Sequence, residues 1–317
     1  MTARWNMPAL LRRERGGFTL LELLVASALT VMIAALALSL VTNALGRWSR
    51  TQGTLTTEGQ ARTVLDQLEV DLQGACHRDD GNVWLAAIIQ GEGSASGVWI
   101  DGRKPITASL DPVTENLAEG RFGVAGVWLR FFTAGGRADA GPAAPAAVSY
   151  QIIRRFPLPS EKTCHYLLYR SDIGAAETFA NGFDLGLPAY GPAASPEGAE
   201  GSLATPGFRQ ILADNVIDFG VRLLGPATEP AAAGRELPVI FPLHVADREY
   251  RAGLVGADGA RQPFPAVVDV MVRILTDDGA RQIAALEAGQ LAGDWWRIAQ
   301  EHSRVFTRRI VLRTTPA

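Results

Sequence analysis

Glu22 is the residue near the start of the chain whose side chain most needs a chemical partner, because its carboxylate lies inside an apolar run. The run begins at Phe18 and continues, from Leu23 to Gly46, with 24 residues that carry no charge. A carboxylate costs about 2 to 3.5 kcal/mol at the centre of a bilayer and less near its edge, so such residues usually pair with another group. Glu22 therefore needs a cation, or it belongs to an ordinary signal anchor and lies near the lipid headgroups.

A pair of small residues, Gly16-Gly17, stands between a basic stretch that ends at Arg15 and the apolar run. An ordinary secretory signal has its small-residue cleavage site after the apolar region, which is then discarded. Here a cut after Gly17 would remove a short cytoplasmic leader and leave the apolar segment at the head of the mature chain. The amine of Phe18 in a neighbouring subunit, offset along a filament, could then pair with Glu22 and fix the axial register.

The uncharged run is long enough to cross a hydrocarbon core of roughly 30 Å once, at about 1.5 Å per helical residue. The arginines before it predict a cytoplasmic N-terminus and an extracytoplasmic remainder after Arg47. Removal of residues 1–17 takes away four arginines and one glutamate, which changes the formal net charge from -3 to -6. A mildly acidic body is not typical of a nucleic-acid-binding protein, so no nucleic acid is expected as a partner.

The segment from Arg15 to Ala26 resembles the class III signal of type IV prepilins and type II secretion pseudopilins. The resemblance implies that a prepilin peptidase cuts after Gly17 and methylates the new N-terminal residue, Phe18. It also implies that Glu22 is the residue that guides filament assembly. The expected partners are other pseudopilins or minor pilins, the prepilin peptidase and an inner-membrane assembly platform, and no cofactor is expected.

The N-terminal helix is predicted to continue beyond the membrane-spanning part, because no proline interrupts the chain as far as Gly74. Apolar residues at helical spacing form a stripe that should pack on the globular body; they are Ala61, Leu65, Leu68 and Leu72. Each interior glycine costs about 1 kcal/mol relative to alanine, so we expect bending or fraying between Gly46 and Gly59. The predicted segments are a leader (1–17), an assembly helix (18–46), an amphipathic continuation (47–75) and a headgroup (76–317).

Beyond Gly81 the apolar residues alternate with polar ones, which predicts half-buried antiparallel strands. The alternating stretches are 127–131, 148–152, 217–223, 268–274 and 306–312. A short helix, from about Ala280 to Leu291, should follow the turn at 277–279. Segments rich in Ala, Gly and Pro, at 134–147, 184–207 and 225–234, are typical of surface loops.

The predicted fold class is therefore α+β, with a long N-terminal helix packed on an antiparallel sheet. This order of elements resembles the minor pseudopilin J of type II secretion systems and the related W-type minor pilins. The segments that carry the resemblance are 211–224 and 265–275.

The two cysteines, Cys76 and Cys164, suggest one disulfide in an exported chain, whereas a cytosolic protein would more often keep two reduced thiols. Such a bridge would close a loop of about 90 residues and stabilise by about 4 to 5 kcal/mol. His77 and His165 follow the cysteines and raise zinc as an alternative, although adjacent residues of a strand point to opposite faces. The acidic turn 79–82 could bind calcium weakly, but such residues more often only form turns.

Catalytic signatures are not found in the sequence, which has no Gly-x-Ser-x-Gly or His-Glu-x-x-His motif. The glycines at 91, 93 and 97 lack the strand-then-helix context that a phosphate-binding loop needs. A membrane-tethered enzyme is therefore disfavoured. The leading hypothesis is a low-copy structural subunit of a type II secretion pseudopilus, at or near its tip. Before assembly it would lie in the inner membrane with its headgroup in the periplasm. The alternative is a minor type IV pilin that acts in pilus assembly, adhesion or DNA uptake.

Overall fold

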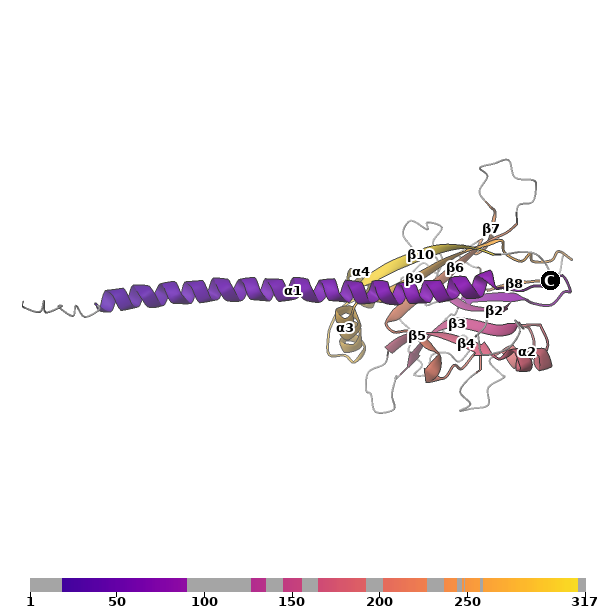
Figure 1. Ribbon diagram of the computed structural model, residues 1–317, viewed down its shortest axis with the longest axis horizontal. Helices are drawn as coiled ribbons and strands as arrows, with labels where there is room; N and C mark the ends of the chain where they lie inside the picture. The colour runs from indigo at the N-terminus through magenta and orange to yellow at the C-terminus, as the bar shows by residue number, and fades with distance from the viewer. Residues whose placement is uncertain are drawn as a thin grey trace, which may run out of the picture. The chain divides into compact units, whose positions relative to one another are not determined.

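The computed structural model describes residues 19–89, 127–134, 145–155, 165–191, 202–226, 237–243, 247, 249–256 and 259–312. The chain divides into two compact units, Met1–Gln52 and Gly53–Ala317. The first contains the apolar half of the N-terminal helix. The second, called here the globular unit, contains the rest of that helix and the described strands (Figure 1).

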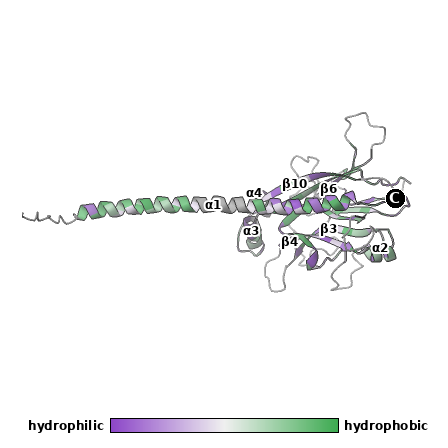
Figure 2. Ribbon diagram, viewed as in Figure 1, coloured by the Kyte–Doolittle hydropathy of each residue, from purple (hydrophilic) through white to green (hydrophobic). Residues whose placement is uncertain are grey.

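Helix α1 runs from Leu20 to Gln73 and has 54 residues. Its helical backbone continues through Gly46, Gly53 and Gly59, so the expected fraying is wrong, whereas bending there stays a prediction. Three glycines cost only a few kcal/mol in total, which 54 consecutive residues of helical hydrogen bonding can sustain. Leu20–Thr42 is the only stretch in the described residues that is long and apolar enough to cross a membrane (Figure 2).

The described strands form two antiparallel sheets in the globular unit. Sheet A has the order β5-β4-β3-β2-β1-β8, and sheet B has the order β10-β9-β6-β7. The strands of sheet A are β1 (Leu85–Ile89), β2 (Val127–Thr133), β3 (Ala146–Arg155), β4 (His165–Ile173), β5 (Ile211–Ala213) and β8 (Glu249–Ala252). The strands of sheet B are β6 (Val216–Leu224), β7 (Val239–Phe241), β9 (Val267–Leu275) and β10 (Ser303–Val311).

Short helices connect or flank the strands. They are α2 (Ala175–Asn181), α3 (Asp277–Glu287) and α4 (Trp295–His302), with 3-10 turns at Pro188–Tyr190 and Phe208–Gln210. Helix α3 begins earlier than expected, because the side chain of Thr276 accepts a hydrogen bond from the Gly279 amide and caps it. The acidic residues that we took for a preceding turn form the first turn of α3, where their negative charge favours the helix N-terminus.

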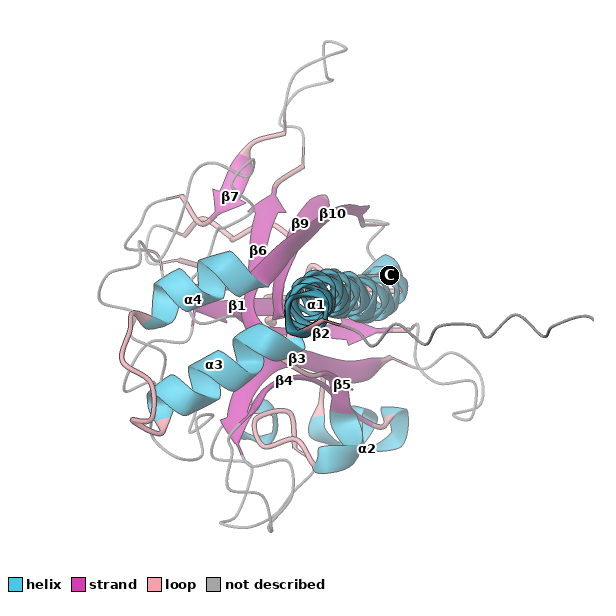
Figure 3. Cartoon of the chain, turned by 90° about the vertical axis from the view of Figure 1, so that its left-hand side faces the viewer, coloured by secondary structure: helices cyan, strands magenta, loops and turns pink. Residues whose placement is uncertain are grey.

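The main core lies where the apolar stripe of α1 meets both sheets (Figure 3). Leu68 and Leu72 are fully buried there, together with Phe131 and Tyr150 of sheet A and Phe219 of sheet B. Burial of a leucine side chain contributes about 1.5 to 3 kcal/mol, so the stripe is a large part of what attaches the helix. The predicted packing of the amphipathic helix on an antiparallel sheet is confirmed.

Two expectations about burial are wrong. Strands β2 and β9 are buried along their whole length, not half-buried. The reason in β2 is a second cluster on the other face of sheet A, where Phe132 packs with Trp84 and Tyr190. Tyr190 and Leu203 belong to the segment 184–207 that we expected to form a surface loop, and both are buried in this cluster.

Candidate assembly site

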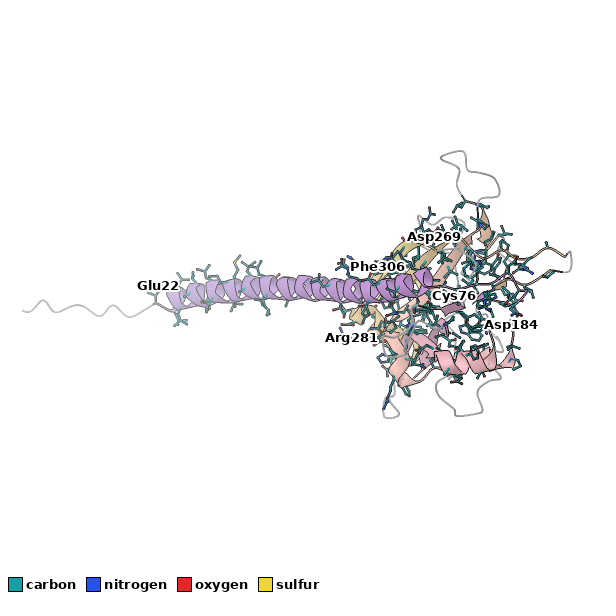
Figure 4. The ribbon with its side chains drawn as sticks, turned by 45° about the vertical axis from the view of Figure 1, so that its right-hand side comes forward. Glu22, Cys76, Asp184, Asp269, Arg281 and Phe306 are labelled. Carbon is teal, nitrogen blue, oxygen red and sulfur yellow. The ribbon has the colours of Figure 1, made fainter. Side chains whose placement is uncertain are left out.

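Thr19 and Glu22 form a reciprocal pair of hydrogen bonds at the start of α1 (Figure 4 labels Glu22). The backbone N–H of Thr19 donates to Glu22 Oε2 at 3.0 Å, and the backbone N–H of Glu22 donates to Thr19 Oγ1 at 3.3 Å. This arrangement is a capping box, which satisfies two amide donors that would otherwise lack a partner at a helix N-terminus. It directs the carboxylate of Glu22 back towards the beginning of the chain.

The position of the carboxylate suits the chemistry expected from the sequence. Thr19 follows Phe18 directly, so Glu22 already binds the amide of the second residue of the predicted mature chain. A negative charge in the first helical turn is also stabilised by the helix dipole. Gly17 and Phe18 lie outside the described residues, and cleavage and methylation there stay predictions.

Three hydroxyl side chains of the apolar span donate hydrogen bonds within the helix; the third is Thr42, which donates to Ser39 O at 3.0 Å. Ser27 donates to Leu24 O at 2.9 Å, and Thr30 donates to Ala26 O at 2.8 Å. Such internal bonding lets hydroxyl groups enter lipid without a partner chain. A carboxylate cannot neutralise its charge in this way, and Glu22 is the only ionisable residue in Leu20–Thr42, so its pairing with an external cation stays a prediction.

A buried carboxylate, Asp71, attaches the far end of α1 to sheet A. It has no exposed surface, and it accepts hydrogen bonds from Arg170 Nε at 2.6 Å and Arg170 Nη2 at 3.1 Å. The hydroxyl of Tyr150 also donates to it, as does Gln67 Nε2 at 3.3 Å. Burial, followed by the nearby Asp71 charge, holds the pKa of Tyr150 well above its usual range. Because Tyr150 and Arg170 come from β3 and β4, this cluster joins the helix to two strands.

A second carboxylate, Glu287, connects α3 to sheet A. It accepts a hydrogen bond from Arg154 Nε at 3.1 Å, one from Trp295 Nε1 at 3.1 Å and one from the hydroxyl of Tyr166. Burial, followed by the charge of Glu287, raises the pKa of Tyr166 well above its usual range. The donors come from β3, β4 and α4, so the carboxylate at the end of α3 joins both helices to sheet A.

Ion pairs on the surface add a third attachment between α1 and sheet B. Arg308 of β10 contacts Asp66 at 2.6 Å and Glu69 at 2.9 Å, and Arg304 contacts Glu58 at 2.8 Å. Exposed pairs of this kind contribute at most about 1 kcal/mol each. These pairs therefore add little to the free energy that attaches β10 to α1, but they favour one alignment of the strand along the helix.

Cys76 is half-buried and carries a free thiol, which donates to Gly74 O at 3.4 Å. Burial raises the pKa of this thiol. Cys164 lies outside the described residues, so the expected disulfide stays a prediction.

His77 and His165 lie near opposite ends of β3. The amide of Cys76, next to His77, bonds to Phe132 O beside the start of that strand, whereas His165 pairs with Arg155 at its end. A strand of this length spans roughly 30 Å, which is too far for a common zinc site. Their ring environments also differ, since His77 stacks on Phe264 and His165 Nδ1 lies 3.2 Å from Asp214 Oδ2. Nowhere in the described part of the chain do three metal-binding side chains come together.

The carboxylates of the acidic turn 79–82 already have partners in the chain. Asp80 Oδ1 accepts hydrogen bonds from the Asn82 amide at 3.0 Å and from Trp84 Nε1 at 2.9 Å. Asp79 forms an ion pair with Arg261. These contacts fit the alternative that we preferred to calcium binding, in which the acidic residues only form a turn.

Several residues of these sites were missed in the sequence. Thr19 could have been found, because Thr-x-x-Glu before an apolar run is the pattern of a capping box. Asp71 and Glu287 gave no such signal, because their partners are distant in the chain. Arg170, for example, is 99 residues from Asp71.

Comparison with known proteins supports the reading of the N-terminus. The family described as the prokaryotic N-terminal methylation motif matches residues 12–38, which include Gly17, Phe18 and Glu22. This match supports a type IV pilin-like protein that is processed by a prepilin peptidase, and the single apolar helix fits a membrane anchor. Neither the curated proteins nor the solved structures contain a significant match to the chain.

Proposed function

We propose that this chain is a minor structural subunit of a type II secretion pseudopilus. A prepilin peptidase cleaves it after Gly17 and methylates Phe18, and the subunit then assembles through α1. The observation that carries the proposal is the carboxylate of Glu22, directed towards the chain start at the head of a 23-residue apolar span. That carboxylate lies within the matched methylation motif.

Before assembly the subunit spans the inner membrane once, with its N-terminus in the cytoplasm and its globular unit in the periplasm. The inner-membrane platform extracts it, and Glu22 pairs with the methylated amine of a neighbouring subunit. Pairing neutralises both charges in an apolar filament core, where an isolated carboxylate is costly. The pairing therefore stabilises one particular axial offset between neighbouring subunits.

A position near the filament tip is supported by the size of the headgroup. The headgroup, residues 76–317, is large, and a large headgroup is difficult to repeat in every subunit of a closely packed filament. At the tip, such a headgroup needs room on one side only. The buried Asp71 cluster then keeps the headgroup attached to the helix that enters the filament.

The alternative is a minor type IV pilin that acts in pilus assembly, adhesion or DNA uptake. It shares the same N-terminal chemistry, so Glu22 does not distinguish the two. The subunits that copurify with the chain do. Pseudopilins and a secretion ATPase system favour the first proposal, whereas pilins of a twitching or competence system favour the second.

The test of assembly compares Glu22→Ala, Glu22→Gln and a control, Glu301→Gln. Glutamine keeps an acceptor oxygen for the Thr19 amide and removes only the charge. Glu301 is an exposed glutamate of α4, distant in sequence from the anchor. We expect all three proteins to be processed and membrane-inserted, and both Glu22 variants to be missing from sheared filaments. Normal incorporation of Glu22→Gln would show that the charge is not required.

A further inference from the structure

We draw no further inference here: the strongest candidate, the cavity of about 370 Å³ between α3 and the start of β4, is lined mostly by apolar side chains and by charged groups that already pair within the chain, Arg281 with Asp278 and His165 with Asp214, so nothing in the described residues shows what would occupy it.

Discussion

Replacement of Asp71 by asparagine should destabilise the globular unit far more than replacement of an exposed aspartate on the same helix. Asp71 is completely buried, and the change leaves Arg170 without its main counter-charge. It also replaces one of the two acceptor oxygens, which together serve Tyr150, Arg170 and Gln67, with an amide group that can only donate. Removal of one partner from a buried pair costs about 3 to 5 kcal/mol. Arg170 keeps a contact with Asp172 at 3.2 Å, so we expect a value near the lower end, about 3 kcal/mol.

The assay is urea unfolding of the full chain in detergent, followed by tryptophan fluorescence. Trp84 and Trp128 are buried in the globular unit and report on its unfolding. The control is Asp66→Asn, which removes a surface contact to Arg308 and should cost less than about 1 kcal/mol. A loss for Asp71→Asn within about 0.5 kcal/mol of this control would refute the claim that Asp71 is the principal polar attachment of α1.

Three further outcomes follow from local geometry and charge. Gly253→Ala should prevent or severely weaken folding, because its Cβ would collide with Asn82 O. Gly259→Ala, also at positive φ but in open space, should cost only the ~1 to 2 kcal/mol of the left-handed conformation; thermal melting compares the two. The raised pKa of Tyr166 means that the unfolded state loses its proton first, so stability should fall as pH rises above about 10. Tyr166→Phe should make that fall shallower in urea titrations across pH. Because the thiol of Cys76 is free, the mass of the intact chain should not change on reduction. A gain of two hydrogen atoms on reduction would instead show that Cys76 and Cys164 had been joined by a disulfide.

The N-terminal helix and its chemistry were largely predictable because their signals are local. The Gly17-Phe18 junction, the uncharged run and the spacing of Glu22 are read directly from neighbouring residues. The apolar stripe through Leu65 and Leu72 recurs every three or four residues, so it indicates the buried face without knowledge of the partner. The glycines misled us because a few unfavourable residues do not break a helix of this length.

The globular unit was harder to predict because its contacts join distant residues. Strand β1 was missed, since its sequence of two alanines and three larger apolar residues does not alternate and it is buried on both faces. Strand β4 was missed as well. The partners of Asp71 are 79 and 99 residues away, and only the pairing of β3 with β4 brings Tyr150 and Arg170 side by side. Nothing in the local sequence specifies such a meeting.

The two ends of α1 carry different polar contacts. At its start, Thr19 and Glu22 form the capping box that holds the carboxylate for which we propose a role in assembly. Near its end, Asp71 binds side chains of sheet A and fixes the helix on the globular unit.

The most direct test of the central claim is the intact mass of the mature chain, purified from a host that has its prepilin peptidase. The mature protein should start at Phe18, lack residues 1–17 and carry the mass of one additional methyl group on its N-terminus. A peptidase-deficient host should yield the complete chain. A mature chain that begins after the apolar span, or retains Met1 in the presence of the peptidase, would contradict the account.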